Sequence, residues 1–255
     1  MTMLACHRLK IRMGQRKLCS KLDLQLDPGQ SWAVIGKNGA GKTTLLHTLA
    51  GLREPTEGDI FLQEKNIQTL GRKQIAQHLG LLLQDQQDPF PASVLETVLA
   101  GRHPYLSLLQ WESAEDHRRA KQSLAALHLD SMEQRDISTL SGGERQRLAI
   151  ATLITQSPLI MLLDEPTNHL DLHHQILALE LLHERNRQQK GVLVMAQHDI
   201  NMVARFCTHV LMMFGDGNTL QGRLRDVLTT ENLECLYGHP IRRIPSRPHD
   251  IFLPD

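Results

Sequence analysis

The chain has 255 residues, of which 41% are hydrophobic and 22% are charged, a composition typical of a globular protein with a sizeable core. Lys plus Arg and Asp plus Glu each number 28, so the net charge is zero and no overall field favours nucleic acid or an anionic membrane. No apolar run approaches the ~20 residues of a membrane-spanning helix. We therefore expect no nucleic-acid partner, and we expect any membrane association to pass through another protein.

The cysteines and the first residues of the chain favour a reducing, cytosolic setting. The four cysteines show no spacing of the kind found in metal knuckles or redox motifs, and they are Cys6, Cys19, Cys207 and Cys235. The opening MTMLACHRLK reaches charged residues before any apolar stretch of the length that a signal peptide needs.

Short apolar runs that do not alternate with polar residues predict strands covered on both faces. The first is WAVI, which ends at Ile35 and precedes a helical pattern from Lys42 to Leu52. The second is LGLLL, which ends at Leu83. From Val94 to Gln156 the pattern is helical, with one helix expected over Ser113 to Leu129. This stretch predicts a helical subdomain inserted into a sheet.

Strand and helix patterns alternate again in the second half of the chain. Three further apolar runs, LIMLL, VLVMA and VLMMF, end at Leu163, Ala196 and Phe214. Helical patterns lie between them over Leu172 to Lys190 and Ile200 to Phe206. The GDGN that follows predicts a hairpin turn, and the proline-containing tail is expected to wrap the surface or to form a loose end. The alternation predicts an α/β fold with a doubly wound, mostly parallel sheet.

A glycine-rich segment joins the first predicted strand to its helix. GKNGAGKT, Gly36 to Thr43, matches the phosphate-loop pattern in the required context of strand, loop and helix. Backbone N–H groups would bind phosphate, Lys42 would reach the β and γ phosphates, and the Thr43 hydroxyl would ligate magnesium. The alternative interpretation is an ordinary glycine-rich turn without a ligand. The strand before the segment and the helix after it disfavour that interpretation. The expected nucleotide contacts are Gly36, Asn38, Gly39, Ala40, Gly41, Lys42, Thr43 and Thr44.

Two carboxylates follow the predicted strand LIMLL. Asp164 and Glu165 stand where the strands of a doubly wound sheet end and where such sheets bind ligands. Taken alone, the pair is more often a cap after a strand. Beside a phosphate loop, however, phosphoryl transfer requires a magnesium ligand and a group that orients water. We expect one of Asp164 and Glu165 to hold magnesium and the other to position water.

Gln84 and His198 each follow one of the apolar runs, in LLLQD and VMAQHD. Lone residues of these types at such positions are usually solvated loop residues. Both are nevertheless expected at the same edge of the sheet as Asp164, where they become candidates to contact the γ-phosphate, magnesium or the attacking water.

A second glycine-lined helix start occurs about a hundred residues after the phosphate loop. In LSGGE, Ser141 and Glu144 have the spacing of a capping box. A capping box does not require glycines in the first turn, where each gives up about 1 kcal/mol of helix propensity relative to alanine. Gly142 and Gly143 would instead let a phosphate lie on the helix N-terminus. The chain therefore carries two half-sites for one anion.

Together these motifs resemble an ATP-binding cassette ATPase over nearly the whole chain. In order, GKNGAGKT resembles the Walker A loop, Gln84 the Q-loop, LSGGE the signature, LIMLLDE the Walker B strand with the catalytic glutamate, NHLD (Asn168 to Asp171) the D-loop, and His198 the switch histidine. The resemblance implies a P-loop NTPase of RecA-like type that uses ATP and Mg²⁺, with an antiparallel β portion beside the parallel sheet.

The resemblance also implies roles for the site residues. Two subunits would meet head to tail, so that the signature of one covers ATP held by the Walker loop of the other. Ser141, Gly142 and Gly143 would contact the partner's γ-phosphate, and Asp171 would lie at the dimer interface. In the hydrolytic centre, Glu165 would polarise water, Lys42 would hold phosphate, and Gln84, also a magnesium ligand, and His198 would sense the γ-phosphate.

One position departs from the family pattern. The family stacks adenine on an aromatic residue upstream of the phosphate loop, commonly just before a glycine. Here Met13 precedes Gly14. A thioether contact would replace part of the aromatic stack.

A softer resemblance points to importers of vitamin B12, iron–siderophore complexes and haem. It rests on DPFPASVLETVLAGRHPYL after the Q-loop and on TTENLECLYGHPIRRI near the end. It implies that Asp85 to Trp111 faces a membrane permease at the cytoplasmic face of the membrane, with an extracytoplasmic substrate-binding protein beyond. The expected organisation is a single cassette over 1–255, with a core of 1–85 and 157–225, a helical subdomain of 86–156, and a C-terminal helix and tail of 226–255.

Two other functions remain as alternatives. A soluble cassette ATPase acting on nucleic acid or ribosomes usually carries two cassettes or a long coiled-coil insertion, and this sequence has neither. A P-loop GTPase or small-molecule kinase would give LSGGE no role, and no Asn-Lys-x-Asp motif for guanine is present.

Overall fold

The computed structural model describes residues 2–84, 91–107 and 109–255. Its larger sheet has six strands in the order β10-β9-β3-β8-β7-β6, and all neighbours are parallel except β9 and β10. Since the chain moves from β3 to the edge at β6 and then returns past β3, the sheet is doubly wound as predicted. Its strands are β3 (Ser31–Ile35), β6 (Leu79–Leu82), β7 (Ile160–Asp164), β8 (Val192–Ala196), β9 (His209–Met213) and β10 (Thr219–Arg223).

The parallel strands are apolar throughout because each face of the sheet packs into a different hydrophobic core. In β7, Met161 and Leu163 belong to one core, whereas Ile160 and Leu162 belong to the other. The same alternation holds along β8 and β3. All five apolar runs of the sequence form strands of this sheet, and the GDGN segment joins β9 to β10 as a hairpin.

A second sheet, antiparallel and four-stranded, is formed by the N-terminal part of the chain in the order β2-β1-β4-β5. Helix α1 packs in the hydrophobic core between this sheet and the parallel one, through Leu45, Leu46 and Leu49. This sheet is the antiparallel portion that the family resemblance implied. Its strands are β1 (Leu4–Met13), β2 (Arg16–Leu26), β4 (Glu57–Leu62) and β5 (Lys65–Asn66).

Helices α1 (Lys42–Leu49), α6 (Leu172–Gln189) and α7 (Ile200–Phe206) are the three that were predicted around the parallel strands. The predicted end of α1 at Leu52 is wrong by three residues. Gly51 adopts a left-handed conformation with φ +68°, and the N–H groups of Gly51 and Leu52 donate back to Thr48 and His47. This is a glycine C-cap, and it ends the helix before the apolar pattern ends.

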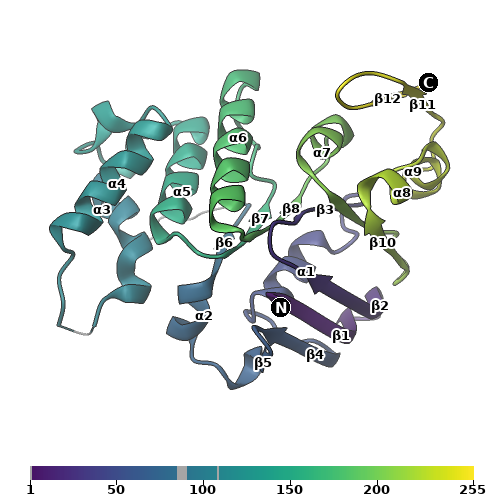
Figure 1. The fold of residues 1–255 in the computed structure, drawn as a ribbon, viewed down its shortest axis with the longest axis horizontal. Helices are drawn as coiled ribbons and strands as arrows, with labels where there is room; N and C mark the ends of the chain where they lie inside the picture. The colour runs from purple at the N-terminus through teal and green to yellow at the C-terminus, as the bar shows by residue number, and fades with distance from the viewer. Residues whose placement is uncertain (1, 85–90, 108) are drawn as a thin grey trace.

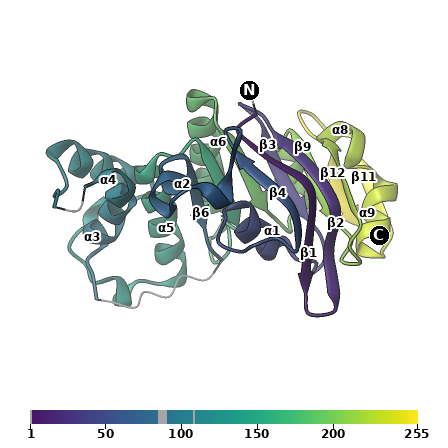
Figure 2. The ribbon, with the colours of Figure 1, turned by 90° about the horizontal axis from the view of Figure 1, so that it is seen from below.

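Helices α3, α4 and α5 form a lobe at one end of the long axis of the molecule, and the C-terminal elements lie at the other end (Figures 1 and 2). No strand occurs within the described part of 83–159, as the sequence predicted. The helices between β5 and β7 are α2 (Arg72–His78), α3 (Val94–Leu99), α4 (Ala114–Ala126) and α5 (Gly142–Gln156), with 3-10 turns η1 (Ile67–Thr69), η2 (Ala100–Tyr105), η3 (Asp130–Met132) and η4 (Ile137–Thr139).

The C-terminal tail is not a loose end. Its strands pair antiparallel, and Asn201 of α7 exchanges hydrogen bonds with the backbone of Phe252, whose side chain is buried. The buried side chains of Ile241 and Phe252, together with the Asn201 hydrogen bonds, anchor the hairpin. The C-terminal elements are α8 (Leu224–Val227), α9 (Thr230–Tyr237), β11 (Ile241–Ile244) and β12 (Ile251–Pro254). Among the described residues, no helix has the length and apolar character needed to cross a membrane.

Candidate functional site

The loop between β3 and α1 has the close backbone contacts that a phosphate loop needs. A Cβ atom on Gly36 would lie 2.6 Å from the carbonyl oxygen of Met213, so only glycine fits there. Gly41 has φ +105° and packs against the Leu18 side chain. Gly36 and Ala40 are buried beneath the loop, while Asn38 and Gly39 are exposed. The backbone N–H groups of the exposed part and the N-terminus of α1 are therefore available to an anion.

Lys42 is held inside this loop. Its Nζ atom donates hydrogen bonds to the carbonyl oxygens of Gly36 at 3.1 Å and Lys37 at 3.5 Å. Burial lowers the pKa of Lys42, and the nearby Glu165 and Asp164 carboxylates oppose that shift. A phosphate group at the loop would replace weak carbonyl partners with anionic oxygens, which form stronger hydrogen bonds to an ammonium group.

Asp164 ends β7 and is fully buried. Among the described residues, no donor meets hydrogen-bond geometry with either of its carboxylate oxygens. Burial raises the pKa of Asp164, and the Thr43 hydroxyl lies close enough to act in the opposite direction. A buried carboxylate without a donor is costly unless a cation joins it. Asp164 with the neighbouring Thr43 hydroxyl therefore fits a magnesium ion, which takes oxygen ligands.

Three donors converge on the Glu165 carboxylate. His198 Nε2 lies 2.8 Å from Oε1, Gln84 Nε2 lies 3.2 Å from Oε2, and the Asn168 side-chain amide also donates to Oε2. Glu165 itself has φ +50°, a left-handed conformation that is uncommon for a residue with a side chain. Local strain of this kind concentrates at functional sites. The predicted residues Gln84, Glu165 and His198 are thus in direct contact.

An open depression of about 660 Å³ lies over the phosphate loop. It brings together predicted residues from both halves of the sequence, including Met13, which is 56% exposed. Arg16 and Leu18 of strand β2 also line it. The sequence analysis missed both residues because they lie outside every recognised motif. The described residues that line it are Met13, Arg16, Leu18, Asn38, Gly39, Gly41, Lys42, Thr43, Thr44, Gln84, Glu165 and His198.

The signature segment does not line this depression. Ser141 is the N-cap of α5, its Oγ accepting from the Glu144 N–H, while Glu144 Oε2 accepts from the Ser141 N–H at 2.7 Å. The capping box that the spacing of Ser141 and Glu144 predicts is therefore present. A Cβ atom on Gly143 would lie 3.0 Å from the His169 carbonyl oxygen, so part of the reason for that glycine lies within its own chain. A Cβ atom on Gly142 would meet only ordinary contacts, from 3.6 Å.

Asp171 also has a role in its own chain. It caps α6 by accepting from the His174 N–H at 2.9 Å, and its side chain is exposed. Like Ser141, it lies outside the set of described residues that line the depression. Within one chain the residues predicted to contact nucleotide therefore fall into two separate groups.

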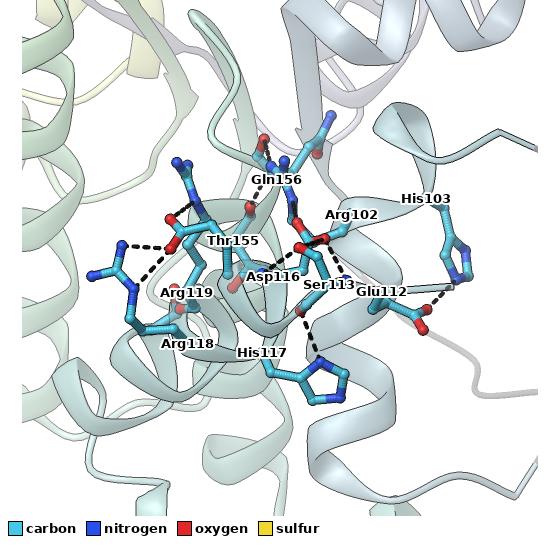
Figure 3. A network of polar contacts seen from close by, with 12 residues as sticks. Arg102, His103, Glu112, Ser113, Asp116, His117, Arg118, Arg119, Thr155 and Gln156 are labelled. Carbon is cyan, nitrogen blue, oxygen red and sulfur yellow. Dashed lines mark hydrogen bonds and ion pairs between the residues drawn. The ribbon is translucent and has the colours of Figure 1, made fainter. Parts of the chain in front are cut away.

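The far end of α5 is fixed by a buried ion pair (Figure 3). Arg102 Nε donates to Asp116 Oδ1 at 2.7 Å, and Arg102 Nη1 donates to the carbonyl oxygens of Thr155 and Gln156 at the end of α5. The guanidinium also lies 4.1 Å above the Tyr105 ring. Hydrogen bonds from the Ser113 hydroxyl and N–H, and then from Arg102, lower the pKa of Asp116 to about 2. Arg102 thus joins α4, α5 and η2.

Comparison with known proteins identifies the fold and the family. A family model described as ABC transporter matches residues 19–168, which is more than half of the chain. The chain belongs to the ABC transporter family. Its site is therefore that of an ATP-binding cassette, and the activity of such subunits is ATP hydrolysis coupled to transport.

Two curated relatives carry names of iron importers. The petrobactin import ATP-binding protein FpuD of Bacillus anthracis is 37% identical over 92% of this chain and 90% of its own length. The ferric enterobactin transport ATP-binding protein FepC of Escherichia coli is 36% identical over 91% of this chain and 85% of its own length.

The fold is also similar to that of two solved ABC transporter structures. A metal-chelate type ABC transporter in an inward-facing conformation has a TM-score of 0.85 and 30% identity, over 100% of this chain and 98% of that one. A dimeric, post-hydrolysis ATP-binding cassette bound to ADP and Pi has a TM-score of 0.76 and 27% identity, over 88% of this chain and 99% of that one. The fold class predicted from the sequence is confirmed.

Proposed function

We propose that this ABC ATPase is a subunit of an importer in which two copies assemble head to tail and couple ATP hydrolysis to uptake of an iron chelate. The separation of the two predicted half-sites within one chain carries the proposal. Lys42, Glu165 and His198 surround one depression, while the Ser141 helix start lies outside it. A second copy placed head to tail would bring its Ser141 helix start to the phosphates bound here.

The contacts of the site fit hydrolysis of the terminal phosphate. Lys42 binds the β and γ phosphates, and Glu165 orients a water molecule and accepts its proton as the new bond to γ-phosphorus forms and the bond to the ADP oxygen breaks. His198 and Gln84, which hold the Glu165 carboxylate, respond to the γ-phosphate beside it. Thr43, Gln84 and Asp164 would hold a magnesium ion, which would supply positive charge to neutralise the phosphates.

The segment proposed to meet the permease carries two large apolar side chains that are almost fully exposed. Leu109 and Trp111 are 95% and 86% exposed, within the predicted segment Asp85 to Trp111. Residues 85–90 and 108 of that segment lie outside the described residues. Nearby, a largely apolar depression of about 400 Å³ is lined in part by Leu52, Leu81 and Pro104. Large exposed apolar side chains of this kind mark protein interaction sites.

The names of the relatives favour an iron–siderophore complex as the cargo, ahead of haem or cobalamin. On this proposal the chain lies at the cytoplasmic face of the membrane, attached through its permease, and an extracytoplasmic binding protein delivers the substrate. Uptake by proteoliposomes that contain the chain and its permease tests the cargo. Transport of radiolabelled cobalamin, with no transport of ferric siderophore, would overturn the iron assignment.

Two substitutions test the ATPase assignment. Lys42→Ala should weaken ATP binding, because it deletes the charge on the phosphates, and Lys37→Ala, at an exposed position of the same loop, is the matched control. Glu165→Gln should leave ATP affinity intact and reduce turnover by about 100-fold or more, because it deletes the water-orienting carboxylate. Calorimetry and phosphate release measure the two effects, and equal loss of affinity in both variants would remove Glu165 from its role.

A further inference from the structure

Arg16 occupies a place in the nucleotide depression that neither the motifs nor the family resemblance assigned. It lies directly across from Met13 in the register of the β1–β2 hairpin, and both residues line the depression over the phosphate loop. The family pattern has an aromatic residue where this chain has Met13. The end of the depression formed by the β1–β2 hairpin thus has a thioether on one strand and a guanidinium on the other.

The Arg16 side chain lies against the backbone of two loops. Its Nε atom donates to the carbonyl oxygen of Gly215 at 3.4 Å. A Cβ atom on Gly39 would lie 3.3 Å from Nη1, and one on Gly215 would lie 3.2 Å from Nη2. Arg16 forms no ion pair with a carboxylate among the described residues. The guanidinium is therefore positioned beside the phosphate loop and is exposed to the depression.

A guanidinium group can take the place of an aromatic ring in stacking on a nucleobase. It is planar, always charged and weakly hydrated, and it stacks on aromatic faces in a way that an ammonium does not. Such groups hold nucleobases by stacking and cation–π contact. The phosphates, in contrast, already have Lys42 and the loop N–H groups.

We propose that the Arg16 guanidinium stacks on the adenine base, with the Met13 thioether beside it, and that this pair replaces the aromatic residue of the family pattern. The proposal rests on ATP binding at this site. Arg16 is on this view a base-binding residue, and its charge acts on the purine face and not on the triphosphate.

Calorimetry with two ligands, ATP and inorganic tripolyphosphate, separates these roles. Arg16→Ala should weaken ATP binding by about tenfold and change the affinity for tripolyphosphate by less than about twofold. Arg16→Lys keeps the charge without the planar group and should behave like Arg16→Ala toward ATP. Adding Met13→Tyr to Arg16→Ala should recover most of the ATP affinity. Lys17→Ala, at the next position of β2, is the matched control and should bind both ligands as the unaltered chain does.

Equal weakening of both ligands by Arg16→Ala would show a phosphate contact and overturn the proposal. Unchanged ATP affinity in Arg16→Ala would overturn it as well, and would leave the ATPase assignment standing. If the unaltered chain binds no ATP, the proposed function fails first. Circular dichroism spectra that match those of the unaltered chain confirm that the variants are folded.

Discussion

At the scale of single residues, Asp164 has the least satisfied environment of the site, because it is buried and its oxygens have no donor among the described residues. We expect Mg²⁺ together with ATP to raise the melting temperature of the chain well beyond ATP with EDTA. A ligand that binds only the folded chain, at 100 times its dissociation constant, raises the free energy of unfolding by about 2.7 kcal/mol. In Asp164→Asn the additional effect of Mg²⁺ should be lost, while the stabilisation by ATP without metal should remain. Thermal unfolding measures both, and an unchanged Mg²⁺ effect would place the ion elsewhere.

The residues that contact Glu165 show how far sequence reasoning reaches at a site. Gln84 and His198 were predicted because each follows a buried strand, and strands of a parallel sheet end at one edge. Asn168 was named only as the first residue of the D-loop, and its contact with Glu165 was missed. Asn168 also donates its N–H to the Glu165 carbonyl, in a turn where Glu165 has a left-handed backbone, and a non-glycine residue in that conformation leaves no signal in a sequence.

At the scale of elements, the start of α5 has two glycines with different surroundings. Gly143 packs against the His169 carbonyl, whereas Gly142 has room for a methyl group. Gly142→Ala should therefore leave the free energy of unfolding unchanged or raise it by up to about 1 kcal/mol, because alanine is the better helix former. If Gly142 exists to admit the partner's phosphate, the same variant should lose about tenfold or more in ATP turnover. Urea unfolding and phosphate release on one preparation measure the two quantities.

The contrast with Gly143 provides the control. Gly143→Ala should destabilise the chain as well as reduce turnover, since its Cβ would press on the D-loop backbone. If Gly142→Ala keeps full ATP turnover, Gly142 does not contact a partner's phosphate. LSGGE would then be a capping box whose glycines serve packing within their own chain.

The lowered pKa of Asp116, which is caused first by the Ser113 hydrogen bonds and then by Arg102, predicts a dependence of stability on pH. The pKa of Asp116 is lowered to about 2 from 3.8, so the folded chain releases this proton more readily than the unfolded chain. The stabilisation is complete well above pH 3.8, declines as the pH falls through 3.8 and is lost toward pH 2; it amounts to about 2 kcal/mol. Relative to Asp116→Asn, the chain should lose this advantage between pH 5 and pH 2.5 in urea unfolding. Parallel stability curves for the two proteins would contradict the assignment.

At the scale of the whole molecule, the separation of the half-sites predicts dimerisation that depends on ATP. Glu165→Gln with ATP should accumulate as a dimer, because Lys42 of one chain and the Ser141 helix start of the other hold an uncleaved γ-phosphate. The chain without nucleotide should be largely monomeric, and ADP should not support the dimer. Light scattering measures the mass of each species.

A second substitution shows whether the half-sites meet in trans. Adding Ser141→Arg to Glu165→Gln would place a bulky cation in the space for the partner's γ-phosphate and should abolish the dimer, with ATP binding by the monomer nearly intact. A double variant that still dimerises, or one that cannot bind ATP as a monomer, would show that the half-sites are not shared between chains.

The architecture was predictable where burial leaves a pattern. The parallel strands separate two cores, and runs such as IMLLD of β7 are apolar for that reason. Strands β1 and β2 have one exposed face and bulged registers, so their alternation is broken and their positions did not emerge from the residues. The C-terminal hairpin was missed because its attachment depends on two buried side chains, Ile241 and Phe252, and on Asn201 some fifty residues before Phe252.

The clamp of Arg102 on the last carbonyls of α5 has a mechanical consequence (Figure 3). Helix α5 has 15 residues, so its axis is ~22 Å long, and its first turn is the part expected to touch a partner's phosphate. A rod of that length that tilts by ~5° about its first turn moves its other end by ~2 Å, which is comparable to helix shifts seen in allosteric transitions. Because Arg102 ties that end to η2 and stacks on Tyr105, such a displacement would move η2 together with the end of α5. On the proposed assembly, α5 would therefore connect the bound nucleotide of the partner chain to the surface proposed for the permease.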